Sequence, residues 1–208
     1  MEITTLILGP LSTNCYLISC PSSQEAIIID PADEGDVISQ EIIKLKLKPK
    51  AIILTHAHFD HAQAILEVKL NFNIPLLFHQ KDLPLYQKIP KNSLFWLKRK
   101  TDPLPPPDKF IKDKQKIKFG QQHLTILETP GHTPGSICLY SSKEKTIFTG
   151  DTLFKNGIGR TDFLYSNHQD IIKSLKKLTK LPADTKVLSG HGEETTIHRE
   201  LTNLSYLF

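Results

Sequence analysis

Four side chains that can bind a metal ion lie within residues 56 to 61, which read His56-Ala57-His58-Phe59-Asp60-His61. The apolar run Ala51 to Leu54 comes directly before them and is typical of a buried strand. His56 and His58 are two positions apart, so at the end of an extended strand both imidazoles point to the same side. Asp60 and His61 need a bend in the chain, which would direct them to a neighbouring position. The spacing therefore favours two metal ions over one.

Three further turns, each after a strand-like apolar run, carry one histidine or aspartate. They read Thr129-Pro130-Gly131-His132-Thr133-Pro134-Gly135, Phe148-Thr149-Gly150-Asp151 and Leu188-Ser189-Gly190-His191-Gly192. In each turn a glycine or proline permits a tight bend or a close backbone approach beside the possible ligand. Imidazole nitrogen and carboxylate oxygen suit zinc, iron or manganese, and no cysteine lies in these turns. One such residue is usually structural, but four such sites in one chain indicate a metal centre.

At these residues the sequence resembles the metallo-β-lactamase-fold hydrolases, and among them the glyoxalase II group (hydroxyacylglutathione hydrolases). Thr55 to His61 resembles the superfamily motif, and segments 149–154 and 157–163 resemble the glyoxalase II-like branch. The resemblance implies two divalent metal ions, most readily zinc, with iron or manganese as alternatives. The implied ligands are His56, His58 and His132 for the first ion, Asp60, His61 and His191 for the second, and Asp151 as the bridge between them.

This ligand set implies a binuclear metal-dependent hydrolase. Two cations about 3.5–4 Å apart can share a water molecule, lower its pKa towards neutrality and polarise a carbonyl group. The expected substrate is a small-molecule thioester, S-lactoylglutathione or a related S-(2-hydroxyacyl)glutathione, which is cleaved to a hydroxy acid and a thiol. Asp151 and Asp60 are the expected catalytic residues, Asp151 as the bridge and Asp60 through a hydrogen bond to the attacking hydroxide.

Arg160 is the expected substrate-binding residue, because in glyoxalase II a basic residue in the matching Gly-x-Gly turn contacts glutathione. Its guanidinium group could pair with a substrate carboxylate through two hydrogen bonds. Alternatively, Arg160 pairs with Asp162 or with a backbone carbonyl. The chain departs from full-length glyoxalase II after His191, where residues 193–208 leave room for one helix. The metal chemistry is therefore better supported than glutathione recognition.

Two other activities of the same fold remain open. Persulfide dioxygenases share the fold and the turn at residues 157–163, but they use a single iron, held here by residues equivalent to His56, His58, His132 and Asp151. Nucleases of the superfamily are the third hypothesis, and the basic residues at 98–100 are its one hint. A metal analysis separates the first two hypotheses, because they require different numbers of ions.

The composition is that of an ordinary globular chain. With 208 residues and 39% hydrophobic content, we expect a single domain over residues 1–208. The net charge of +4 comes from scattered lysines, which favours a solvated surface over a nucleic-acid groove. We expect neither a signal peptide nor a membrane span, because the first residues look like a strand and no apolar stretch approaches ~18 residues. The expected protein is cytoplasmic, a monomer or homodimer, with no nucleic-acid or membrane partner and with Cys15, Cys20 and Cys138 as free buried thiols.

Short apolar runs alternate with turns and helical patterns along the chain. Strands are expected at 3–8, 15–19, 26–29, 51–54, 75–78, 123–128, 136–140, 146–149 and 186–189, and helices at 37–47, 62–70 and 170–180. The pattern by itself predicts only mixed α and β structure (α+β). The resemblance implies a four-layer αββα sandwich.

Residues 84–110 depart from this alternation because they are rich in proline. Proline at that density opposes regular structure, so we expect a long excursion over the surface. The excursion could simply pack on the surface, cover the active-site mouth or form a dimer contact. Phe95 and Trp96 are the aromatic side chains that would mark such a contact.

Overall fold

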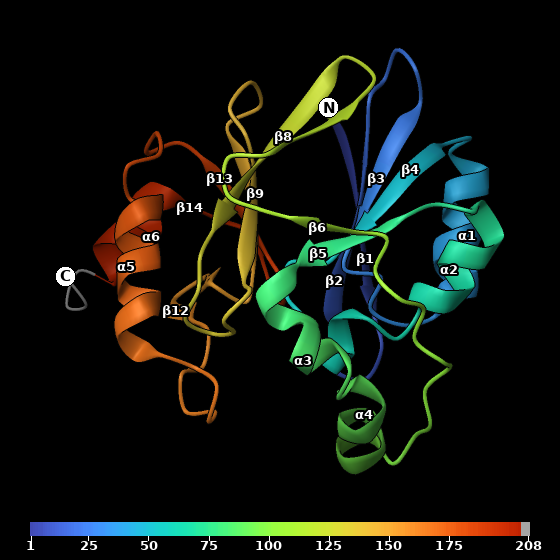
Figure 1. Ribbon diagram of the computed structural model, residues 1–208. Helices are drawn as coiled ribbons and strands as arrows, with labels where there is room; N and C mark the ends of the chain where they lie inside the picture. The colour runs from blue at the N-terminus through green and yellow to red at the C-terminus, as the bar shows by residue number, and fades with distance from the viewer. Residues whose placement is uncertain (205–208) are drawn as a thin grey trace.

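The computed structural model describes residues 1–204, and its framework is two six-stranded β-sheets that face each other (Figure 1). The first sheet contains, in spatial order, β1 (Glu2–Leu8), β2 (Thr13–Ser19), β3 (Glu25–Ile29), β4 (Lys48–Ile53), β5 (Leu76–His79) and β6 (Lys109–Ile111). The second contains β14 (Thr195–Thr196), β13 (Lys186–Ser189), β10 (Thr146–Gly150), β9 (Ile137–Ser141), β8 (Gln122–Glu128) and β7 (Lys116–Phe119). A separate two-stranded ribbon is formed by β11 (Leu153–Phe154) and β12 (Gly157–Ile158).

The central strands contain continuous apolar runs because both of their faces are buried. In β2, Leu17 packs with the helices that cover the first sheet, whereas its neighbour Ile18 packs between the two sheets. Ile28 and Ile27 of β3 divide in the same way. Successive side chains of a strand point to opposite faces, so a strand between two apolar layers needs a continuous apolar run.

Helices cover the outer face of each sheet, as Figure 1 shows. The first sheet is covered by α1 (Gly35–Lys44) and α2 (Ile65–Phe72), and the second by α5 (His168–Leu178) and α6 (Ile197–Asn203). In α5 the side chain of Asn167 caps the first turn by accepting a hydrogen bond from the backbone N–H of Asp170 at 3.0 Å. The helix then buries Ile171 and Leu175 on one stripe. The expected four-layer αββα sandwich is therefore confirmed.

Backbone hydrogen bonds join the two sheets at one end of the sandwich. The N–H of Asn14 in β2 donates to the carbonyl of Gly190 after β13 at 2.7 Å, and the N–H of Ile137 in β9 donates to the carbonyl of Thr55 after β4 at 2.9 Å. In the second sheet β10 and β13 run parallel, with Gly150 opposite Ser189, so the turns after these strands lie side by side. The turns that carry the predicted ligands therefore meet at this end.

The expectation that residues 84–110 oppose regular structure is wrong for their first part. Two helices lie there, α3 (Leu83–Tyr86) and α4 (Ile89–Leu97). Pro84 and Pro90 occupy the first turn of α3 and α4, where the missing N–H would have no partner in the helix. The later prolines precede β6, an edge strand that the sequence analysis missed.

Three smaller findings complete the fold. The helix expected from Ala62 begins at Ile65, because the 3₁₀ turn η1 (Phe59–His61) comes first and turns Asp60 and His61 inward. All three cysteines are free and buried, as expected. None of the helices within residues 1–204 has the length and apolar character to cross a membrane.

Candidate metal centre

The seven predicted ligands lie together at the end of the sandwich where the two sheets are joined. They form two adjacent groups whose nitrogen and oxygen atoms lie within 4.8 Å of one another: His56, His58, His132 and Asp151 in the first, and Asp60, His61 and His191 in the second. In the first group, His58 Nδ1 lies 3.1 Å from His56 Nε2 and 3.0 Å from His132 Nε2. In the second group, Asp60 Oδ2 lies 3.2 Å from His191 Nε2 and 3.5 Å from His61 Nε2.

The Asp151 carboxylate faces both groups. Its Oδ2 lies 3.5 Å from His132 Nε2 in the first group and 3.7 Å from His191 Nε2 in the second. Its Oδ1 lies 3.4 Å from His61 Nε2. This placement is the one that a bridging ligand requires.

The outer nitrogen of each imidazole is held by a hydrogen-bond partner. His61 Nδ1 donates to Asp30 Oδ2 at 2.9 Å, His132 Nδ1 to the carbonyl of Arg160 at 2.9 Å, and His191 Nδ1 to the carbonyl of Leu11 at 3.1 Å. These acceptors carry no proton, so each of these histidines holds its proton on the outer nitrogen. The inner nitrogen of a neutral ring then presents a lone pair to the centre.

The same assignment holds for His56. Thr55 donates its hydroxyl proton to Asp30 Oδ2 at 2.7 Å, so Thr55 Oγ1 accepts from His56 Nδ1 at 3.1 Å. The outer nitrogen of His58, Nε2, lies 2.8 Å from the Tyr165 hydroxyl. In the first group the inner nitrogens of three imidazoles lie close together, with His58 Nδ1 about 3 Å from the inner nitrogens of His56 and His132. Lone pairs at such distances repel unless a cation lies between them.

Two buried atoms of the centre are placed as a bound cation would require. His61 Nε2 and Asp151 Oδ1 have no hydrogen-bond partner among residues 1–204, although both are shielded from solvent. Buried polar atoms without a partner are rare, and each calls for an ion, a water molecule or strain. Because these two atoms belong to different strand ends and face each other, the residues present fit a divalent metal centre.

The two groups differ in their affinity for protons. Burial lowers the pKa of His58 to about 3, and burial together with neighbouring imidazoles holds the pKa of His56 well below its ordinary value. Burial also acts to lower the pKa of His61, but the carboxylates of Asp60 and Asp151 outweigh it and raise this pKa well above the ordinary value. The pKa of His191 is likewise raised, against the effect of burial, by Asp60 and Asp151. Without a metal ion, positive charge is therefore favoured in the second group and disfavoured in the first.

Glycines allow the turns of the centre to approach each other. A Cβ atom on Gly190 would lie 2.3 Å from Asp151 Oδ1 and 2.6 Å from His61 Cε1. A Cβ on Gly150 would lie 2.3 Å from Thr55 Oγ1, and the φ angle of this glycine is +48°. Both glycines come directly before a predicted ligand, so a side chain at either position would displace the centre.

The sequence analysis missed the residues that hold the outer nitrogens. Asp30 accepts hydrogen bonds from the N–H and the hydroxyl of Thr55 and from His61, and its exposed fraction is 1%. The sequence could have indicated Asp30, because it directly follows an apolar strand in the same way as Asp151 does. Tyr165 had no such signal, because only the folded chain brings it to His58.

Arg160 pairs with Asp162, which is the second of the two interpretations. Its Nε and Nη2 donate to the two Asp162 oxygens at 2.9 and 2.7 Å, and both side chains are exposed. The guanidinium group also lies 4.7 Å from the centre of the Phe163 ring. A contact between Arg160 and a substrate stays a prediction.

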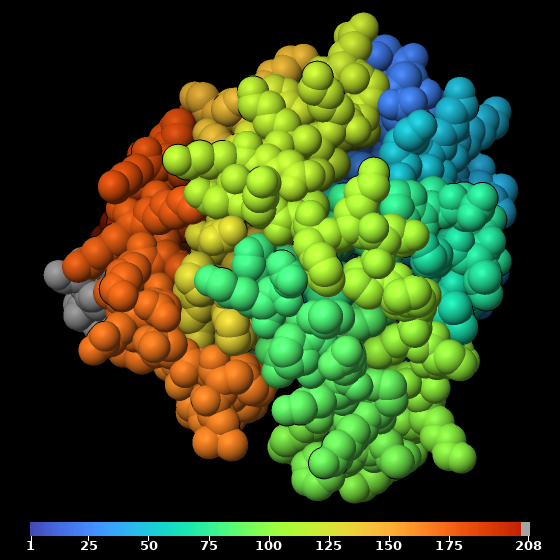
Figure 2. All heavy atoms as spheres, viewed as in Figure 1, coloured from blue at the N-terminus to red at the C-terminus, as the bar shows by residue number. Residues whose placement is uncertain are grey.

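Two segments flank the centre, α4 and the segment before α5. Tyr165 contacts His58 on one side, and on the other Leu97 of α4 lines a small pocket together with Leu11 and Asp60. In Figure 2, α4 (green) and the segment before α5 (orange) project at the same end of the molecule with a notch between them. The end of α4, within the 84–110 excursion, therefore lies beside Asp60. Phe95 and Trp96 are exposed, and a role for them stays a prediction.

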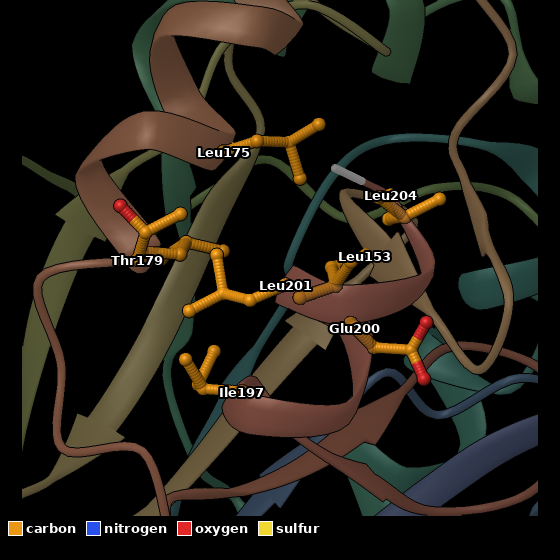
Figure 3. A pocket seen from close by; sticks show the side chains of 8 residues that line it. Leu153, Leu175, Thr179, Ile197, Glu200, Leu201 and Leu204 are labelled. Carbon is orange, nitrogen blue, oxygen red and sulfur yellow. The ribbon is translucent and has the colours of Figure 1, made fainter. Parts of the chain in front are cut away.

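A second pocket, between α5 and α6, offers no comparable chemistry (Figure 3). Its walls are mainly leucine and isoleucine side chains, among them Leu175 and Ile197. Its one carboxylate, Glu200, already accepts hydrogen bonds from the Thr195 hydroxyl at 2.6 Å and from the N–H of Asn156 at 2.8 Å. This pocket is a packing gap beside the second sheet.

Comparison with known proteins agrees with this geometry. The chain is 39% identical over 201 residues to the "Probable metallo-hydrolase YqgX" of Bacillus subtilis, across 96% of this chain and 94% of that protein. It is 34% identical to the hydroxyacylglutathione hydrolase GloC of Haemophilus influenzae, across 100% of this chain and 98% of that protein.

Solved structures show the same architecture. The BLEG-1 B3 metallo-beta-lactamase superposes with a TM-score of 0.91 at 34% identity, over 99% of each chain. TTHA1623, solved in a di-iron-bound form, superposes with a TM-score of 0.89 at 33% identity, over 96% of this chain and 98% of that one. The sequence model of one family matches residues 8–191, a range that includes all seven side chains of the centre. The chain belongs to the metallo-beta-lactamase superfamily.

Proposed function

We propose that the protein is a binuclear metal-dependent hydrolase that cleaves thioesters, with S-(2-hydroxyacyl)glutathione, such as S-lactoylglutathione, as its substrate class. The observation that carries the proposal is the convergence of five inward imidazole nitrogens on two positions that share Asp151. The name of the Haemophilus relative, hydroxyacylglutathione hydrolase, supports the substrate class. We propose zinc as the metal, and the di-iron-bound form of TTHA1623 supports iron as the alternative.

Two divalent ions at these positions would lower the pKa of a water molecule and polarise the carbonyl group of a thioester. The first would be held by His56, His58 and His132, the second by Asp60, His61 and His191, and Asp151 would contact both. Burial acts to raise the pKa of Asp60, but His61 and His191 lower it overall, so the carboxylate stays ionised. It accepts a hydrogen bond from Thr13 Oγ1 at 3.3 Å and can accept another from the attacking water. The chain needs no nucleophilic side chain for this reaction.

We propose that the polar arm of the substrate binds at the rim beside the first position. The rings of Phe163 and Tyr165 stack there with centroids 5.3 Å apart, and the Arg160 guanidinium lies over Phe163. A glutathione carboxylate could replace Asp162 as the partner of this guanidinium, because both offer the same pair of oxygens.

The test combines elemental analysis of the purified protein with turnover of a substrate panel. We expect two divalent ions per chain and the highest kcat/KM for S-lactoylglutathione, compared with simple acyl thioesters, glutathione persulfide and a β-lactam. The lactam is included because BLEG-1 is a B3 metallo-beta-lactamase. A single iron per chain with oxygen uptake on glutathione persulfide would replace this proposal by the dioxygenase.

As the pH falls, we expect the ion of the second position to leave before the ion of the first. A metal ion competes with protons for its ligands. In the metal-free protein the pKa values of His61 and His191 are raised, so protons compete with the second ion for these rings at higher pH. The pKa of His58 is about 3, so protons compete with the first ion for this ring only at lower pH. Elemental analysis after dialysis at decreasing pH should show a plateau near one ion per chain.

The control for this prediction is His191→Ala, which disables the second position. Its remaining ion should persist to the same low pH as the plateau ion of the unmodified protein. Loss of both ions in one step, at one pH, would contradict the expected order.

A further inference from the structure

Asp82 is a fully buried carboxylate that lies outside the set of seven predicted ligands. It is the last residue of η2 (Gln80–Asp82), the short 3₁₀ turn that follows β5, and its exposed fraction is 0%. A carboxylate removed from water is costly unless hydrogen-bond donors replace the solvent. The positions of its donors therefore indicate what the residue does.

All three donors come from the two turns that carry the imidazoles of the first position. Ala57, which lies between the two histidines of the turn after β4, donates its N–H to Asp82 Oδ2 at 2.9 Å. In the turn after β8, Thr133 donates its hydroxyl to Oδ2 at 2.8 Å and Gly135 donates its N–H to Oδ1 at 2.6 Å. One carboxylate thus connects a turn from the first sheet to a turn from the second.

Asp82 packs tightly against the turn after β8, with no room for a side chain at Gly135. A Cβ atom on Gly135 would lie 2.7 Å from Asp82 Oδ1 and 2.8 Å from the Asp82 backbone nitrogen. Ser136 Oγ also accepts the N–H of Thr133 at 3.1 Å and lies 2.7 Å from its hydroxyl. The turn that contains His132 is therefore held against Asp82 at a fixed separation.

We propose that Asp82 is a positioning residue that sets the spacing of the three first-position imidazoles without contacting the ion. It acts through Ala57, which lies between His56 and His58, and through Thr133 and Gly135, which follow His132. It differs in this from Asp30, which bonds directly to the ring of His61. The proposal rests on the two-ion centre proposed above, and it adds a second buried carboxylate, besides Asp30, on which the geometry of the first position depends.

The experiment measures the affinity of the first position for Co²⁺. In a His191→Ala background the tightly bound ion reports that position, and chelator competition gives its Kd while visible absorption reports its coordination. Adding Asp82→Asn should weaken Co²⁺ binding about 10- to 100-fold, the usual range for residues that orient metal ligands. The absorption bands should also change in intensity, because an amide N–H₂ group then faces a backbone N–H donor and the imidazoles shift.

Asp113→Asn is the matched control. The Asp113 carboxylate also accepts a backbone N–H, that of Glu128 at 2.9 Å, and it pairs with Lys177 at 2.8 Å, but it contacts neither histidine turn. We expect its Co²⁺ affinity and spectrum to match those of the His191→Ala background. Thr133→Val, which removes one donor and keeps the side-chain shape, should weaken binding several-fold and serves as the test if Asp82→Asn does not fold.

Two results would overturn the proposal. One is an unchanged Kd and spectrum in a folded Asp82→Asn or, failing that, Thr133→Val protein. The other is an equal loss of affinity in the Asp82 and Asp113 variants, which would show a general effect on the fold. Neither readout uses a substrate, so failure of the thioesterase proposal is a separate outcome.

Discussion

Replacing Asp151 with alanine is expected to remove both metal ions and to lower kcat/KM for the thioester by about 10³-fold or more. That loss corresponds to about 4 kcal/mol of transition-state stabilisation, the scale of the contribution of bound metal ions to catalysis. The reason is geometric: Asp151 Oδ2 faces His132 and His191, one from each group, while Oδ1 faces His61. Elemental analysis of the purified variant should find less than one ion per chain.

His191→Ala is the comparison for this variant. It removes a side chain that belongs to the second group only, so it should retain about one ion per chain. Near-ultraviolet circular dichroism on both variants would show that the fold is intact. A metal content in Asp151→Ala equal to that of the unmodified protein would disprove the bridging assignment.

Replacing Gly190 with alanine should have the second largest effect, although it changes no ligand. The added methyl group would lie 2.3 Å from Asp151 Oδ1 and 2.6 Å from His61 Cε1, so both side chains must move. Overpacking of this kind costs about 1–3 kcal/mol. Because the displaced atoms belong to two of the proposed ligands, we expect activity to fall about 100-fold, as for other changes that misplace a ligand. Metal content and kcat/KM would be measured together.

Gly157→Ala is the matched control for the steric argument. A Cβ at Gly157 meets no atom of residues 1–204 within 4 Å, and its backbone, like that of Gly190, is outside the positive-φ region. We therefore expect wild-type metal content, activity and melting temperature. If Gly190→Ala were equally harmless, the close approach of the turn after β13 to Asp151 would be incorrect.

The seven residues that the structure brings together could be selected from the sequence because each lies in a turn shortly after an apolar run. Period-two spacing placed His56 and His58 on one side of a strand end, and both belong to the first group. The turns around His132, Asp151 and His191 each combine a strand end with glycine or proline, which is a local signal. Each of these side chains could be identified as a candidate ligand from its own turn. Their assignment to two metal positions came from the family resemblance.

The residues that hold these side chains in place could not be predicted in the same way. The partner of His58, Tyr165, is 107 positions away, and the partner of His191, the carbonyl of Leu11, is 180 positions away. Such hydrogen bonds depend on tertiary packing and leave no periodic pattern. Likewise, a count of prolines does not predict α4, because proline opposes a helix only beyond its first turn. Pro90 lies in the first helical turn, where proline is favoured.

Each position of the centre takes side chains from both halves of the sandwich. The first combines His56 and His58 after β4 with His132 after β8, and the second combines His61 with His191 after β13. An ion bound there would link the two halves, so its binding adds to the free energy of unfolding by about 4.1 kcal/mol when free metal is 1,000 times its Kd. A cell starved of that metal would hold a chain that opens more often and is degraded faster by proteases. Metal supply would then control the abundance of this protein as well as its activity.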